Sequence, residues 1–181
     1  TSLFLTTIYS QELFFSEYSE GSSYNKYLEI FNPRSQTINL SDYAIASVMN
    51  GPDSPGQHER WLEFLSDATI SSGEIYLIVH ESADQSLVSQ ADTLISASSV
   101  YWNGDDGIAL VLGIESNYTV IDVIGQNITD TDYDDPGSGW EVAGVENGTR
   151  DHTLVRKPSV TTGNTVWTLS AGTDADNSEW I

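Results

Sequence analysis

The chain has 181 residues, 39% of them apolar, which suits one domain with a single hydrophobic core. Asp and Glu number 27 against six Lys and Arg, and the net charge of −21 disfavours nucleic acids and other polyanions as direct partners. The absence of cysteine excludes disulfides and thiolate metal sites, and the longest apolar runs are far too short to span a membrane.

Short segments rich in β-branched and aromatic residues recur along the chain, and Gly, Asn, Asp or Pro separates nearly all of them. This pattern predicts β-strands joined by turns. The predicted strands are, in chain order, residues 12–19, 26–32, 43–49, 74–80, 107–113, 118–125, 152–157 and 165–169. At most one short helix is expected, within residues 82–91. The chain is therefore predicted to be all-β, a sandwich or a barrel.

The first two predicted strands carry an unusual pair of glutamates. The short polar loop between residues 12–19 and residues 26–32 favours an antiparallel pair, and one register sets Glu17 directly across from Glu29. Like charges in that position are destabilising unless a cation, a proton or an arginine intervenes. Both glutamates are therefore candidate metal ligands, and for Glu29 a structural or cation-linked role is favoured over a catalytic one.

The segment "NGDDGIALV" places Asp105 and Asp106 just before a predicted strand. The favoured interpretation is a turn, because Asn, Gly and Asp are the usual turn residues. The alternative is that both carboxylates join Glu17 or Glu29 around a calcium ion.

The segment "DTDYDDPGSGWE" is the strongest candidate for a metal site. Asp130, Asp132 and Asp134 occupy positions 1, 3 and 5 of a calcium-loop pattern, and Glu141 falls at position 12. Asp135 stands where that pattern expects glycine and no flanking helices are predicted, so this is not an EF-hand. Carboxylates this close repel one another, and a hard cation such as calcium would relieve the repulsion. A solvated acidic loop without a metal is the equal alternative.

The tryptophans and the tail allow two interpretations. The tail segment "TDADNSEWI" is expected to dock through Trp180, with its acidic side chains pointing outward. The five tryptophans are expected to anchor the core and the strand edges, and a sugar-stacking platform is the alternative. They are Trp61, Trp102, Trp140, Trp167 and Trp180.

Catalysis is not expected. His58, His80 and His152 lie far apart in the sequence, and the chain has no zincin helix, nucleophile elbow or phosphate-binding glycine loop. A catalytic site needs convergent geometry, which nothing in the sequence indicates.

Eight segments in a fixed order point to one family. They are "FFSEYSEGSSYNKYLEIFNP", "INLSDYAI", "SSGEIYLIV", "NGDDGIALV", "VIDVIGQ", "DPGSGW", "TLVRKPSVTTG" and "EWI". Together they resemble a bacterial lamin tail domain over residues 12–181, which leaves residues 1–11 as a linker or an extra edge strand. The chain departs from the family pattern in the lengthened loop "NITDTDY", and in His152, where a basic residue is common.

The resemblance implies an immunoglobulin-like β-sandwich without catalytic activity. Lamin tail domains bind protein partners, and in bacteria they occur on secreted multidomain proteins, often beside a nuclease or phosphoesterase domain. We therefore expect a non-catalytic interaction module of a secreted or cell-surface protein. Its partner would be a protein or a polysaccharide. One alternative is a calcium-dependent carbohydrate-binding module, and another is an accessory part of a secreted nuclease or phosphoesterase whose catalytic domain lies outside this chain.

Composition agrees with that location. Ser, Thr, Asn and Asp supply most of the polarity, while charged residues make up only 18% of the chain. Together with the acidity, this favours an extracellular or periplasmic protein, and charge repulsion favours a monomer. The basic residues form one close group, near Arg156, which is too small for a phosphate-binding surface.

Overall fold

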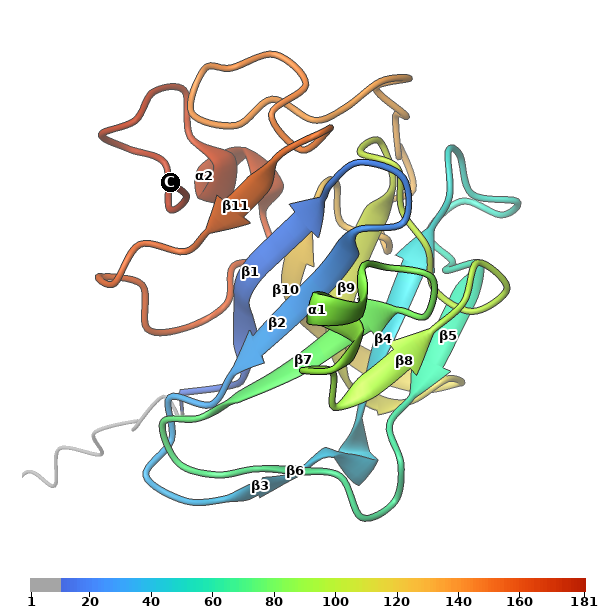
Figure 1. Ribbon diagram of the computed structural model, residues 1–181. Helices are drawn as coiled ribbons and strands as arrows, with labels where there is room; N and C mark the ends of the chain where they lie inside the picture. Colours follow the sequence, from blue (N-terminus) through green and yellow to red (C-terminus); the bar gives the residue numbers. More distant parts are fainter. Residues whose placement is uncertain (1–10) are drawn as a thin grey trace, which may run out of the picture.

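The structure is a computed structural model that describes residues 11–181. It is an immunoglobulin-like β-sandwich, in which Figure 1 shows a five-stranded sheet lying in front of a four-stranded sheet. The first sheet has the strand order β11 (Thr153–Val155), β1 (Phe14–Glu20), β2 (Lys26–Phe31), β7 (Ile75–His80) and β8 (Thr93–Ile95). The second has the order β10 (Asn117–Ile124), β9 (Gly107–Ile114), β4 (Tyr43–Val48) and β5 (Arg60–Glu63).

The remaining elements are short. β3 (Ile38–Asn39) pairs with β6 (Thr69–Ile70), and the 3₁₀ turn η1 (Leu40–Asp42) leads from β3 into β4. The helices are α1 (Gln85–Val88) and α2 (Trp167–Ala171). None of the described helices is long and apolar enough to cross a membrane.

The all-β prediction is confirmed, and seven of the eight predicted strand segments contain a strand. The predicted helix within residues 82–91 is also present, as α1. The sequence pattern missed β3, β5, β6 and β8, which have only two to four residues each, too few to show an alternation. The prediction of a linker or edge strand at residues 1–11 lies outside the described residues, apart from Gln11.

The predicted strand at residues 165–169 is wrong, because its last three residues begin α2 (Trp167–Ala171), a second helix where at most one was expected. Trp167, Ser170 and Ala171 are buried, and this i, i+3, i+4 spacing lies on one face of a helix. The ring of Trp167 packs against Trp180, 6.3 Å between centroids. Gly172 then ends the helix at φ +66°, a conformation that glycine adopts without steric cost.

One hydrophobic core fills the space between the sheets, and it includes Phe15, Ile30, Ile45 and Leu110. β4 is buried along its whole length, on both of its faces. On the face turned away from the first sheet, Ala46 lies between Ala109 of β9 and the half-buried Trp61 of β5 in register. The Trp61 side chain thereby shields Ala46 and Ala109 from solvent.

A buried ion pair joins the C-terminal part of the chain to the core. Asp122 of β10 accepts a hydrogen bond from Arg156 Nη2 at 2.8 Å and another from the N–H of Phe15 in β1, also 2.8 Å. The Arg156 guanidinium lies 4.1 Å from the centre of the Trp180 ring. Trp180 is buried, which confirms the prediction that this residue docks the tail. The prediction that the tail's acidic side chains point outward is wrong for Glu179, which is half-buried and accepts a hydrogen bond from Arg156 Nη1 at 2.7 Å.

Candidate functional site

The acidic loop, residues 127–141, is organised by an amide side chain. Gln126 Nε2 donates to Asp130 Oδ2 at 3.2 Å and to the carbonyl oxygen of Asp132 at 3.4 Å. Gln126 Oε1 accepts from the N–H of Asp134 at 2.9 Å. In the part of the chain that the structure describes, no three Asp, Glu or His side chains lie together as metal ligands would. The predicted calcium ligands are thus not assembled, and calcium binding by this loop stays a prediction.

The predicted register of the two glutamates is confirmed, because Glu17 pairs directly with Glu29. Each carboxylate accepts a hydrogen bond from a hydroxyl: Tyr27 Oη donates to Glu17 Oε2 at 2.9 Å, and Ser16 Oγ donates to Glu29 Oε1 at 2.7 Å. Burial raises the pKa of Glu29, the Ser16 hydrogen bond opposes that rise, and the charge of Glu17 adds to it. Two hydroxyl groups therefore stabilise a pair for which the sequence suggested a cation.

Asp105 and Asp106 form the turn that was expected. Gly104 has φ +112°, and Asp106 Oδ2 accepts from the N–H of Asn103 at 2.7 Å. Burial raises the pKa of Asp106 to about 6, and the neighbouring charge of Asp105 also raises it. Among the described residues these two aspartates do not lie together with Glu17 or Glu29 as a group of metal ligands would, and calcium binding here stays a prediction.

A polar cleft of about 310 Å³ opens beside this turn. Its buried lysine, Lys26, pairs with Glu20 and lies 5.4 Å from the centre of the Tyr101 ring. Glu20 also accepts from the N–H of Asp151 at 2.5 Å, so the pair ties the β1–β2 hairpin to the chain before β11. The cleft is lined by Glu20, Ser23, Lys26, Tyr101, Asn103, Asp105, Gly137, Ser138, Arg150 and Asp151. Its cations are already paired with carboxylates, as in a structural network.

The three histidines have different partners. His58 Nδ1 bonds Tyr118 Oη at 3.1 Å, and His152 Nδ1 contacts the carbonyl oxygen of Arg150 at 2.5 Å. His80 is buried, stacks on Tyr24 with 4.6 Å between centroids, and has a pKa lowered by that burial. Within residues 11–181, none of the three histidines has a serine hydroxyl as a hydrogen-bond partner. A Ser-His-Asp arrangement is therefore not present among these residues.

The predicted role of the tryptophans as anchors holds for the three that are buried, Trp102, Trp167 and Trp180. The half-buried Trp61 belongs instead to an aromatic group with His58 and Tyr118, which we call the His58 cradle. Its three ring centroids are 5.1 to 5.4 Å apart. The sequence pattern missed this group, because strand pairing brings residues 58 and 118 together.

A cleft of about 560 Å³, here called the Trp140 cleft, lies between the acidic loop and the segment around α2. The acidic loop forms one wall and α2, with the residues just before and after it, forms the other. The lining residues are Gln126, Asn127, Asp130, Trp140, Glu141, Thr165, Val166, Trp167, Thr168, Ala171, Gly172 and Thr173. Ligand sites in proteins are commonly of this size, mostly apolar, with a few polar groups.

Of the four residues of the acidic loop predicted to bind calcium, two line this cleft. Asp130 and Glu141 are lining residues, whereas Asp132 and Asp134 are exposed and do not line it. The sequence analysis thus singled out Asp130 and Glu141, but as calcium ligands and not as residues of a cleft. It missed the opposite wall, because that wall depends on Trp167–Ala171 forming a helix.

Comparison with known proteins agrees with this fold. The family model of the Lamin Tail Domain matches residues 7–127, two thirds of the chain. No curated protein matches the chain significantly. The match ends before most of the Trp140 cleft, and a domain boundary at residue 181 stays a prediction. Because the match covers the strands from β1 to β10, the chain belongs to the lamin tail domain family, a non-catalytic immunoglobulin-like family.

Proposed function

We propose that the chain is a non-catalytic recognition module of a secreted or cell-surface protein, and that it binds a segment of a protein partner in the Trp140 cleft. The observation that carries the proposal is the cleft itself, which combines about 560 Å³ with an apolar floor of Trp140, Trp167 and Ala171. Polar groups at its rim, such as Glu141 and Thr168, supply the few directional contacts that fix a ligand's orientation.

Hydrogen bonds join the two walls of the cleft. Asn127 Nδ2 donates to the carbonyl oxygen of Thr165 at 3.1 Å across one end, and the N–H of Ala143 donates to the carbonyl oxygen of Ala171 at 2.9 Å near the other. Hydrogen bonds between the two walls limit the ordering that binding would require, and a preorganised site gains affinity for that reason.

The chemistry of the titratable groups supports a non-catalytic role. Asp106 accepts a backbone hydrogen bond within its turn, and Lys26 is paired with Glu20. The histidines are hydrogen-bonded to other groups or buried. A general base has to reach a substrate proton directly, and Asp106, Lys26 and His80 are buried. His58 and His152 are hydrogen-bonded, to Tyr118 Oη and to the carbonyl oxygen of Arg150. Membership of a non-catalytic family points the same way.

The distribution of cations supports a protein partner over nucleic acid. Arg156 is buried in the pair with Asp122, which removes the centre of the basic group seen in the sequence. Lys157 donates to the carbonyl oxygen of Ala175 at 2.6 Å. With a net charge of −21, few cations remain to bind phosphates. If a nuclease or phosphoesterase domain accompanies this chain in a secreted protein, the module would bind a protein partner next to that catalytic domain.

Peptide display tests the proposal. We expect wild-type protein to enrich peptides from a random library, and Thr168→Trp to lose that enrichment because the new ring fills the cleft. Leu169→Trp is the matched control, because Leu169 is exposed on the same helix and does not line the cleft. Equal enrichment on all three proteins, or on none, would overturn the proposal.

A carbohydrate-binding module is the second candidate, and the His58 cradle favours it. Trp61 and Tyr118 are partly exposed, and their ring centroids are 5.3 Å apart. Proteins bind the apolar faces of sugars by stacking them on aromatic rings of this kind. A glycan array probed with wild type and with Tyr118→Leu, in calcium and in chelator, tests it. Sugar binding that Tyr118→Leu abolishes would favour this candidate, and loss of that binding in chelator would add the calcium dependence.

A further inference from the structure

We propose that the Trp140 cleft selects a positively charged side chain, an arginine presented by an extended segment of the protein partner. This inference rests on the proposed function and adds the chemical class of the ligand. The juxtaposition that carries it is an apolar floor, built around Trp140, with two carboxylates at its edge, Asp130 and Glu141.

The two carboxylates have no cation of their own. Each ion pair formed among residues 11–181 involves other acids, namely Glu12, Glu20, Glu115, Asp122, Asp151 and Glu179. Asp130 accepts one hydrogen bond, from the neutral amide of Gln126, and its charge is not balanced by it. Glu141 is exposed, and of the described residues that line the cleft none is basic. A ligand that brings a positive charge would therefore meet two unpaired negative charges.

The floor suits a flat, weakly hydrated cation. Trp140 is held by a hydrogen bond from its Nε1 to the carbonyl oxygen of Asp106, 3.1 Å, and by edge-to-face packing on Tyr133, 5.9 Å between centroids. A ring fixed in this way offers its remaining surface to a ligand at little entropic cost. A guanidinium group stacks on tryptophan and bonds carboxylates in a fork, whereas an ammonium group is compact and strongly hydrated.

The same chemistry is already used inside this protein. Arg156 lies 4.1 Å from the centre of the Trp180 ring, while its two terminal nitrogens donate to Asp122 at 2.8 Å and to Glu179 at 2.7 Å. That site combines a tryptophan with two carboxylates, as the cleft does with Trp140, Asp130 and Glu141. At the internal site the arginine, Arg156, comes from the chain itself. None of the described residues that line the cleft is an arginine, so the ligand would supply it.

The test uses two capped pentapeptides, Gly-Leu-Arg-Leu-Gly and the same sequence with citrulline in place of arginine. Citrulline keeps the length and planarity of the side chain but carries no charge. Binding is followed by amide NMR of the whole chain at physiological salt. We expect the arginine peptide to shift the resonances of Trp140, Thr168 and Gly172, and the citrulline peptide to bind about tenfold more weakly or worse.

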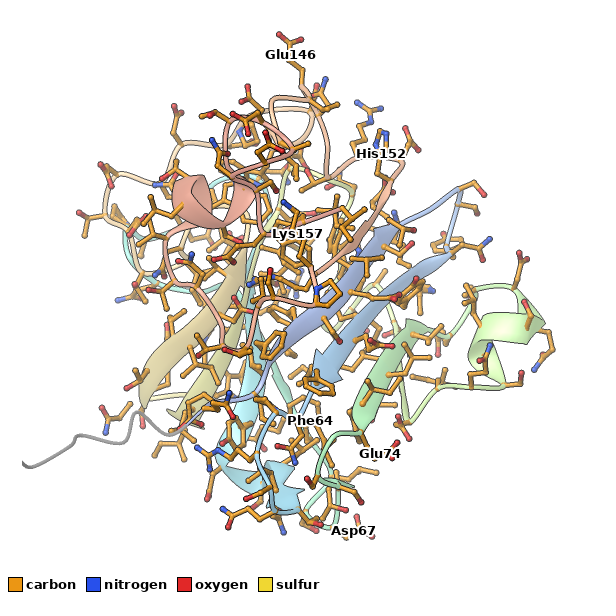
Figure 2. All side chains as sticks on the ribbon, turned by 90° about the vertical axis from the view of Figure 1, so that its left-hand side faces the viewer. Phe64, Asp67, Glu74, Glu146, His152 and Lys157 are labelled. Atoms are coloured by element: carbon orange, nitrogen blue, oxygen red, sulfur yellow. The ribbon has the colours of Figure 1, made fainter. Side chains whose placement is uncertain are left out.

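Charge variants separate a local contact from the general attraction of an acidic protein for a cation. We expect Glu141→Gln and Asp130→Asn each to weaken the arginine peptide about tenfold, with no change for the citrulline peptide. The matched controls are Glu146→Gln and Asp67→Asn, which remove the same charge elsewhere. Figure 2 shows Glu146 at the outer tip of its loop and Asp67 at the opposite end of the molecule.

Three results would overturn the inference: equal affinity for the two pentapeptides, no binding of either at millimolar concentration, or equal losses in the controls and in Glu141→Gln. The display experiment keeps the proposed function distinct. Selected peptides that contain no basic residue, and whose binding Thr168→Trp abolishes, would support the proposed function. They would contradict the inference that the cleft selects an arginine. If selection never depends on the cleft, the proposed function itself fails.

Discussion

Asp122 and Asp106 are both buried aspartates, and the fold treats them differently. Asp122 has 0% of its surface exposed and accepts four hydrogen bonds, from Arg156 and from the N–H groups of Phe15, Val123 and Asn164. Asp106, at 3% exposure, has two backbone donors, Asn103 at 2.7 Å and Asn50 at 3.3 Å, and it has a second carboxylate beside it.

The difference shows how an acidic chain distributes its few cations. Burial raises the pKa of both carboxylates, and at Asp122 the charge of Arg156 and the backbone donors oppose that rise. At Asp106 only backbone donors oppose it, and its pKa rises to about 6. Of the six basic residues, Arg156 and Lys26 are buried in ion pairs, so the surface of the module keeps a strong negative charge.

The largest effect is expected at Asp122. Asp122→Asn keeps the size of the side chain but leaves the buried Arg156 guanidinium short of a counter-charge, and breaking such a pair typically costs about 3–5 kcal/mol. Urea unfolding at neutral pH measures the loss, with Asp67→Asn as a control for removing an exposed acid. A loss below about 1 kcal/mol, which is the range of a surface pair, would contradict the role assigned to this site.

Asp106 should make stability depend on pH in the opposite sense to an ordinary aspartate. Its pKa in the folded protein, about 6, is above the ordinary aspartate value of 3.8. Its contribution is therefore fully present below about pH 4 and is lost as pH rises through 6, by up to about 3 kcal/mol. Asp106→Asn removes this titration and does not lose stability in this way. The free energy of unfolding of the variant relative to wild type should therefore rise between pH 4 and pH 7, by up to about 3 kcal/mol.

The free energy of unfolding of both proteins in urea, at the two pH values, gives this difference directly. Asp67→Asn should leave the pH profile of the wild type unchanged. A gap between Asp106→Asn and wild type that is the same at both pH values would show that folding does not shift the pKa of Asp106.

A smaller effect is expected at the paired glutamates. Glu29→Gln relieves the like charge opposite Glu17 and still accepts the Ser16 hydrogen bond, so it should stabilise by about 0.5 kcal/mol. For a domain of this size that is about 1–2 °C in Tm at low salt. The gain should shrink in 1 M NaCl, since salt screens partly exposed charges. A gain that high salt leaves intact would indicate packing instead of charge as the cause.

The smallest effect is expected from calcium. Binding would have to rearrange the acidic loop, because Gln126 holds it and its carboxylates do not converge. At a calcium concentration equal to Kd, the stabilisation is about 0.4 kcal/mol, or about 1–2 °C in Tm. Asp132→Asn should abolish this shift. Melting curves in chelator and in millimolar calcium that coincide would identify a solvated acidic loop.

The candidate site could be predicted only in part. Trp140, Asp130 and Glu141 attracted attention in the sequence, the first as an aromatic anchor and the other two as calcium ligands. Their common cleft depends on α2, where alternating β-branched residues suggested a strand. Helix and strand were equally compatible with so short a segment. The burial of Trp167 and Ala171 against the tail decided in favour of the helix.

The sequence by itself determined most of the longer strands, because period-two alternation and turn residues are local properties that each segment carries alone. It did not determine the strands of two to four residues, which are too short to show that alternation. It even indicated the register of Glu17 and Glu29, since a short loop leaves few alternatives. The tertiary structure alone decided which carboxylates are compensated: Asp122 meets Arg156 across 34 residues, and Asp106 meets no cation. Compensation depends on distance and burial in space, and the order of residues along the chain does not encode either of them directly.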